Sequence, residues 1–117
     1  MLKVKILHNR RCSKSREALN ILKDKGIEPE IIDYLRNPLS KSEIENLLKL
    51  LCLEPQKLIR KKEPIYKKLI IDESRLAYEE WIDIIWKNPI LIERPIVIIN
   101  NQKAIIARPG ELVEEIL

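Results

Sequence analysis

The chain has 117 residues, of which 45% are apolar and 34% charged, and its formal net charge is +4. This length and composition suit one domain with one core, and so modest a charge does not require nucleic acid as a partner. No stretch is apolar for long enough to span a bilayer, and two cysteines make no disulfide framework. A strand pattern follows the first residues directly, without a signal-peptide pattern, so we expect a cytoplasmic protein.

The first third of the chain predicts a strand, a helix and a second strand. Residues 3–7 alternate between charged and apolar side chains, as a half-buried strand does. Apolar residues at helical spacing between Ser15 and Lys25 predict a helix that ends at Gly26. Residues 29–34 are typical of a second strand. Short links make these elements a βαβ unit, so the two strands should be parallel.

The middle of the chain has helical patterns and no strand signal. Ser40, followed three residues later by Glu43, is a capping-box pattern that should start a helix. Shorter helical segments are expected at about 54–62 and 64–69, and a longer helix over 74–87. The inward-facing residues expected on that last helix are Leu76, Ile82, Ile85 and Trp86.

The last third of the chain predicts two further strands and a closing helix. The continuous β-branched run over residues 96–99 indicates a buried central strand. Asn100 and Asn101 form a turn signal, and residues 103–107 should be the partner strand of a hairpin. A closing helix should begin at Pro109.

The order βαβ, then helices, then ββα is typical of a thioredoxin-like α/β fold. We expect a single domain over residues 1–117, with a helical insertion at about 39–88 between its two halves. An open α/β sandwich with another strand order is the alternative. The polar loop after the first strand and the Arg-Pro pair before the third favour the thioredoxin-like arrangement.

A cysteine at the predicted start of the first helix is the most informative feature of the sequence. Cys12 lies in the polar run 8–16, where free backbone N–H groups and the positive end of the helix dipole favour a thiolate. Positive charge is added by Arg10, Arg11, Lys14 and Arg16. We therefore interpret Cys12 as reactive. Cys52 lies in an apolar run and is interpreted as a core or helix-end residue.

Cys12 and Ser15 form a C-x-x-S motif. The resolving cysteine of dithiol oxidoreductases occupies the fourth position, so this loop cannot close its own disulfide. The Ser15 hydroxyl could instead donate a hydrogen bond toward the thiolate, cap the helix, or do both. His8 lies four residues before the thiol, and it is either an electrostatic support for a thiolate or a structural residue at a strand end.

Three arginines stand out from a lysine-rich background. Arg60 lies near the end of a predicted helix, Arg94 immediately precedes Pro95, and Arg108 ends the last predicted strand. In a thioredoxin-like fold the residue before the third strand faces the nucleophile, so we expect a cis Arg94–Pro95 bond. The planar guanidinium binds oxyanions through two parallel hydrogen bonds and stays charged. The alternative for each arginine is a surface salt bridge, for example with Glu93 or Glu63.

Five segments that together span essentially the whole chain carry a family resemblance: His8-Asn9-x-x-Cys12-x-x-Ser15-Arg16, Tyr34-Leu35-x-Asn37-Pro38, Leu58-Ile59-Arg60-Lys61, Pro89-Ile90-Leu91-Ile92-x-Arg94-Pro95-Ile96-Val97 and Arg108-Pro109. They resemble the glutaredoxin-linked arsenate reductases. The run over residues 89–97 is highly specific, whereas C-x-x-S alone would be a weak signal.

The resemblance implies a set of site residues and a chemistry. Cys12 corresponds to the catalytic cysteine, and His8 and Ser15 match residues that support the thiolate. The oxyanion-binding residues are Arg60, Arg94 and Arg108. Cys12 would attack arsenate, glutathione would reduce the adduct as a co-substrate, and a glutaredoxin would resolve the mixed disulfide as arsenite leaves. No metal or bound cofactor is needed, and we expect a monomer without nucleic-acid or membrane partners.

Other functions remain open at this point. The phosphatase-like arsenate reductases are disfavoured, because they need C-x5-R and Ala18 occupies that arginine position. Spx-type transcription regulators share the fold and bind RNA polymerase, but they usually carry C-x-x-C, whose second cysteine is Ser15 here. A third possibility is a thiol oxidoreductase that acts on glutathione mixed disulfides, with the arginines binding carboxylates.

Overall fold

The computed structural model describes residues 3–9, 12–69 and 71–107. Contacts between residues divide the chain into two compact units. The sheet unit comprises Met1–Asn37 and Arg94–Leu117, and the helical unit comprises Pro38–Glu93. The helical unit includes the segment at about 39–88 that the sequence predicts as an insertion. The expectation of a single domain over the whole chain stays a prediction.

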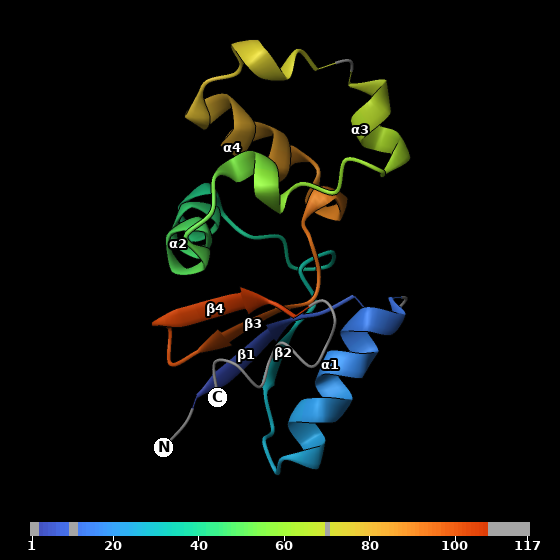
Figure 1. The fold of residues 1–117 in the computed structure, drawn as a ribbon, viewed down its shortest axis with the longest axis vertical. Helices are drawn as coiled ribbons and strands as arrows, with labels where there is room; N and C mark the ends of the chain where they lie inside the picture. Colours follow the sequence, from blue (N-terminus) through green and yellow to red (C-terminus); the bar gives the residue numbers. More distant parts are fainter. Residues whose placement is uncertain (1–2, 10–11, 70, 108–117) are drawn as a thin grey trace. The chain divides into compact units, whose positions relative to one another are not determined.

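The sheet unit contains a four-stranded sheet in the order β2-β1-β3-β4 (Figure 1). Its strands are β1 (Val4–Leu7), β2 (Glu30–Ile32), β3 (Ile96–Ile99) and β4 (Lys103–Ile106). β1 pairs in parallel with β2 and antiparallel with β3, and β3 pairs antiparallel with β4. These pairings confirm the βαβ unit, the central third strand and the hairpin predicted from the sequence.

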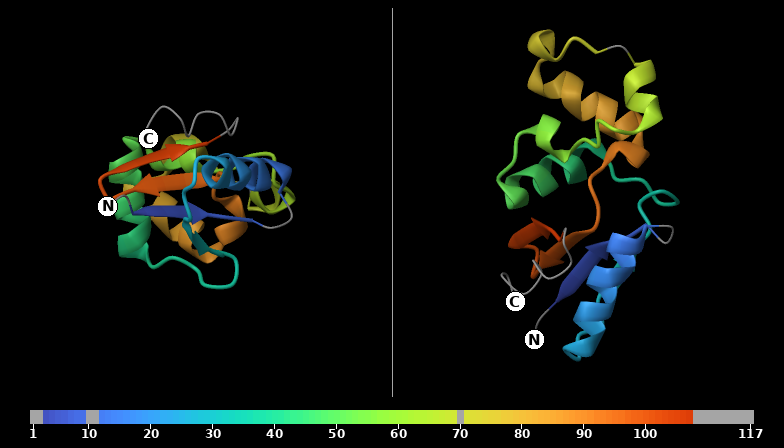
Figure 2. Two further views of the ribbon diagram at one scale, coloured as in Figure 1. Left: turned by 90° about the horizontal axis from the view of Figure 1, so that it is seen from below. Right: turned by 45° about the vertical axis from the view of Figure 1, so that its right-hand side comes forward.

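Helix α1 (Ser13–Asp24) lies along one side of this sheet (Figure 2). Its Ala18 and Leu22 are fully buried against apolar residues of β1 and β3. The cluster consists of Val4, Ile6, Ala18, Leu22, Val97, Ile99 and Ala107. Burying a leucine side chain stabilises the fold by about 1.5–3 kcal/mol, so this packing holds the start of α1 beside the end of β1.

Two turns of the sheet unit follow the local sequence signals. Gly26 has φ +75°, and the N–H of Ile27 donates to the carbonyl of Leu22 at 3.0 Å, which closes the end of α1. Asn100 and Asn101 have φ of 53° and 54°. The N–H of Gln102 donates to the carbonyl of Ile99 at 3.0 Å and closes a tight turn around these two residues, and asparagine tolerates positive φ well.

The helical unit begins with α2 (Lys41–Leu51), and its predicted capping box is confirmed. The N–H of Glu43 donates to Ser40 Oγ at 3.2 Å, and the N–H of Ser40 donates to Glu43 Oε1 at 3.0 Å. α2 packs against α4 (Tyr78–Lys87). The buried residues of the two helices are Ile44, Leu47, Leu48, Trp81, Ile82 and Ile85.

The helix predicted at about 54–62 is wrong in its extent. The segment forms only the short 3-10 helix η1 (Pro55–Leu58). Ile59 then makes an antiparallel bridge with Ile92, next to the 3-10 helix η3 (Pro89–Leu91). The N–H of Arg60 donates to the carbonyl of Leu91 at 2.7 Å. Arg60 therefore lies two residues after the end of η1, and its backbone pairs with a distant segment in place of continuing a helix.

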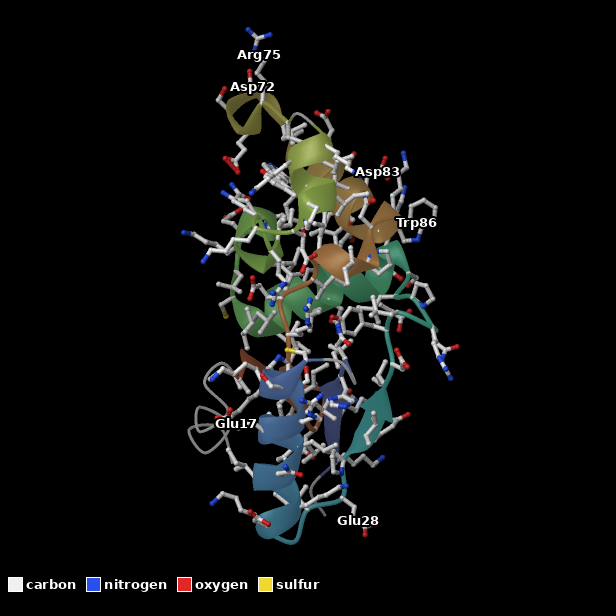
Figure 3. All side chains as sticks on the ribbon, turned by 90° about the vertical axis from the view of Figure 1, so that its right-hand side faces the viewer. Glu17, Glu28, Asp72, Arg75, Asp83 and Trp86 are labelled. Atoms are coloured by element: carbon white, nitrogen blue, oxygen red, sulfur yellow. The ribbon has the colours of Figure 1, made fainter. Side chains whose placement is uncertain are left out.

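The helix predicted over 74–87 is divided into two elements. The 3-10 helix η2 (Glu73–Arg75) comes first, and α4 begins only after Ala77, whose N–H donates to Glu80 Oε1 at 3.2 Å. Ile82 and Ile85 face inward as predicted, but Trp86 is 42% exposed. Figure 3 shows Trp86 extending from α4. Trp81 fills the core instead, because it lies four residues before Ile85 and therefore on the same buried face of α4.

The short helix α3 (Pro64–Lys68) matches its predicted segment closely. Within the described part of the chain, no helix has both the length and the apolar character needed to cross a membrane. The closing helix predicted from Pro109 lies outside the described residues.

The capping box gives a stability prediction. Replacing Ser40 with alanine should lower the free energy of unfolding by about 1 kcal/mol, because the N–H of Glu43 loses its acceptor. Urea denaturation followed by circular dichroism measures the change. Ser40→Asp keeps an acceptor and should retain most of the stability, so equal losses in the two variants would contradict a capping role.

Candidate thiol site at the start of helix α1

Cys12 is the residue that caps the N-terminus of α1. Its backbone is extended, with φ −94° and ψ 121°, and its carbonyl accepts from the N–H of Arg16 at 3.2 Å. Its own N–H donates to the carbonyl of Asn9 at 3.0 Å, which ties the helix start to the end of β1. The half-buried thiol therefore lies beside the free N–H groups of the first helical turn.

Ser15 is the third residue of α1 and is fully buried. Its Oγ accepts from the backbone N–H of Asn9 at 3.4 Å, and its hydroxyl and its backbone N–H both form hydrogen bonds with Cys12. The predicted capping role of Ser15 is wrong, because Cys12 occupies the capping position. The arrangement fits the other predicted role, a hydroxyl that donates toward a thiolate.

Arg94 approaches Cys12 from the segment that leads into β3. The Arg94–Pro95 bond is cis, as expected from the sequence. Burial would raise the pKa of the Cys12 thiol. Hydrogen bonds from the Ser15 N–H, the Arg94 guanidinium, the Lys14 N–H and the Ser15 hydroxyl outweigh burial and lower that pKa to about 7. The lowered pKa favours the thiolate of Cys12 near neutral pH, where an ordinary cysteine is mostly protonated.

The Arg94 guanidinium itself interacts with two side chains. Burial would lower the pKa of Arg94, but its hydrogen bond to Cys12 and its interactions with Tyr34 raise that pKa above its usual value. Tyr34 is fully buried. The sequence analysis gave no role to Tyr34 or to Asn9, although both stand in segments that carry the family resemblance. That resemblance was the only signal that pointed to them.

His8 directly follows β1, and its side chain is buried. Its backbone N–H donates to the carbonyl of Ile32 at 3.0 Å, which extends the pairing of β1 with β2. His8 is thus the structural residue at a strand end that the sequence analysis considered. Its predicted support of the thiolate stays a prediction.

The structure does not test the oxyanion roles predicted for the other two arginines. Arg60 belongs to the helical unit, and its Nε lies 3.2 Å from Glu63 Oε1. This ion pair is the alternative that the sequence analysis named, and an oxyanion role for Arg60 stays a prediction. Arg108 lies outside the described residues.

Cys52 ends α2 in a left-handed conformation, with φ 55°, and its side chain is exposed. The interpretation as a helix-end residue is confirmed, and the interpretation as a core residue is wrong. Among the described residues, no group of three or more histidine, cysteine or acidic side chains could hold a metal ion.

The different surroundings of the two cysteines give a second prediction. Cys12 should react with iodoacetamide at a rate that rises with pH through about 7, because only the thiolate reacts and its pKa is lowered to that value. Cys52 lies at the other end of a helix, the C-terminal end of α2, and so lacks the N–H groups of a first helical turn that bond to Cys12. Mass spectrometry of quenched samples would measure both rates. Faster labelling of Cys52 at neutral pH would contradict the site assignment.

Known proteins resemble this chain over nearly its whole length, and the ArsC family model matches residues 7–116. The chain is 49% identical over 115 residues to "Uncharacterized protein YfgD" of Escherichia coli K12, covering 97% of this chain and 96% of that protein. It is 44% identical over 117 residues to an arsenate reductase of Haemophilus influenzae, covering 99% and 100%. The solved structure of an arsenate reductase from Vibrio cholerae has 42% identity and a TM-score of 0.94, covering 99% of this chain and 98% of that chain. The fold is thus the thioredoxin-like α/β fold of these relatives, and the chain belongs to the ArsC family.

Proposed function

We propose that the protein is an arsenate reductase that uses Cys12 as its nucleophile and takes its electrons from glutathione. The observation that carries this proposal is the pairing of the Cys12 thiol with the Arg94 guanidinium at the start of α1. A thiol with a pKa of about 7 is a nucleophile at neutral pH, and the cation beside it suits an oxyanion. Relatives that carry the name arsenate reductase support the choice of substrate.

The first step is an exchange at arsenic without a change of oxidation state. Arsenate is a tetrahedral oxyanion like phosphate. The Cys12 thiolate attacks arsenic, and one arsenate oxygen leaves as water after it is protonated. Arg94 donates hydrogen bonds to the remaining oxygens and offsets their charge. Arg60 and Arg108 join Arg94 in this role in the proposal, on the strength of the family resemblance.

The second step reduces the arsenic. The glutathione thiolate attacks the sulfur of the adduct, and the electron pair of the sulfur–arsenic bond passes to arsenic. As(V) becomes As(III) and leaves as arsenite, while Cys12 and glutathione are oxidised to a mixed disulfide. A glutaredoxin then takes the glutathione moiety and frees Cys12. Thiols carry both electrons, so the proposal needs no metal or flavin, and it places the protein in the reducing cytoplasm.

A coupled assay tests the proposed activity. With glutathione, glutaredoxin and glutathione reductase present, NADPH should be oxidised only when arsenate is added. Cys12→Ser should abolish this turnover, and Cys52→Ser should retain it, because Cys52 is an exposed residue at the end of α2. Reduction of a glutathionylated peptide without any arsenate-dependent turnover would contradict the proposal and favour a mixed-disulfide oxidoreductase.

Arg94 gives a further prediction. Arsenate should protect Cys12 from alkylation, and Arg94→Lys should weaken this protection, because lysine keeps the charge but lacks the planar guanidinium. Losing one charge-assisted hydrogen bond should raise the arsenate concentration needed for protection by roughly tenfold to a hundredfold.

The matched control is Arg75→Lys. Arg75 lies in η2, and its exposed side chain forms an ion pair with Asp72, in which Arg75 Nε and Asp72 Oδ2 are 3.2 Å apart. Figure 3 labels both side chains. Its replacement should leave the protection of Cys12 unchanged. Equal effects of the two variants would indicate a general response to positive charge and no oxyanion site at Arg94.

A further inference from the structure

Arg60 is held by its backbone in a fixed place within the helical unit. Its N–H donates to the carbonyl of Leu91 at 2.7 Å, next to the antiparallel bridge between Ile59 and Ile92. Its carbonyl accepts from the N–H of Glu63 at 3.1 Å, which closes a turn before α3. Both backbone groups of Arg60 are therefore bonded, so its remaining freedom is that of its long side chain.

The Arg60 side chain is in turn bonded to Glu63. Arg60 Nε donates to Glu63 Oε1 at 3.2 Å, and the two side chains are 19% and 20% exposed. An exposed ion pair contributes little, because water competes for both charges and two long side chains must be ordered. Water competes less for this pair, because both side chains are mostly buried. The carboxylate of Glu63 therefore restricts the orientation of the Arg60 guanidinium.

The ion pair uses one of the five N–H groups of the guanidinium. The other four are carried by its two terminal nitrogens. No second partner of this guanidinium occurs within the described part of the chain. Two terminal nitrogens in one plane can bind an oxyanion through parallel hydrogen bonds. A carboxylate that occupies Nε leaves those two nitrogens available.

We propose that Glu63 is a positioning residue that holds Arg60 through Nε and so presents its two terminal nitrogens to an oxyanion. Without Glu63, the arginine side chain would be ordered only when the anion binds, and the cost of that ordering would weaken binding. The negative charge of Glu63 has the opposite effect, because it repels an anion. That the oxyanion is arsenate rests on the proposed function.

The experiment measures oxyanion binding without turnover. In a Cys12→Ser background, which lacks the attacking thiol, isothermal titration calorimetry gives the dissociation constants of arsenate and of sulfate. Glu63→Gln and Glu63→Ala both lose the negative charge, but only glutamine can still accept from Arg60 Nε. Glu63→Ala should therefore bind an oxyanion roughly twofold to tenfold more weakly than Glu63→Gln, which corresponds to the cost of ordering one long side chain. Equal dissociation constants, or no binding of either anion, would overturn the proposal.

The pair of Arg75 and Asp72 is the matched control. Arg75 Nε also lies 3.2 Å from a carboxylate oxygen three residues away, but the two side chains are 85% and 58% exposed. Asp72→Asn and Asp72→Ala should therefore bind each oxyanion equally well. A difference as large as that between the two Glu63 variants would overturn the proposal, because it would show a response that is not specific to Arg60.

A double-mutant cycle separates positioning from a general structural effect. In an Arg60→Met background, the difference between Glu63→Gln and Glu63→Ala should vanish, because the residue through which Glu63 acts is gone. A difference that persists would overturn the proposal. Sulfate binding that depends on Glu63 and Arg60, in a protein that neither binds nor reduces arsenate, would contradict the proposed function and leave this inference intact, so the two failures are distinguishable.

Discussion

The site depends on the mutual stabilisation of one thiol and one guanidinium. Burying a thiolate or a cation alone costs free energy, because the charge loses contact with water. When the two lie together, each reduces the free-energy cost of burying the other. Here burial opposes the charge of Cys12 and of Arg94, and their hydrogen bond outweighs it only together with the other favourable interactions of each group. The N–H groups at the start of α1 add to the effect on Cys12. The pair therefore exists before any substrate binds.

The register of the sheet explains how distant segments meet at this pair. Leu7, at the end of β1, pairs with Ile32 at the end of β2 and with Ile96 at the start of β3. The loop after β1, the turn after β2 and the segment before β3 therefore emerge at one end of the sheet. These three segments carry Cys12, Tyr34 and Arg94 respectively. Packing of α1 against β1 and β3 holds the fourth component, the helix start, at the same place.

Local signals in the sequence predicted much of this structure, and tertiary contacts account for what they missed. The Ser40 capping box and the turn at Gly26 depend on neighbouring residues, and both were predicted. The extended segment at Arg60 depends on pairing with the segment around Leu91, which no local pattern reveals. Cys12 was found because a helix start is a local feature, whereas the complete burial of Tyr34 depends on the packing of the folded chain.

The most direct test of the proposed chemistry is to trap the mixed disulfide that it requires. The protein would be mixed with arsenate and glutathione in the absence of glutaredoxin, and then analysed by mass spectrometry alongside an assay for arsenite. The proposal predicts a glutathione adduct on Cys12 alone and an equimolar amount of arsenite, with neither formed when arsenate is omitted. Arsenite without an adduct on Cys12, or an adduct on Cys52 instead, would contradict it.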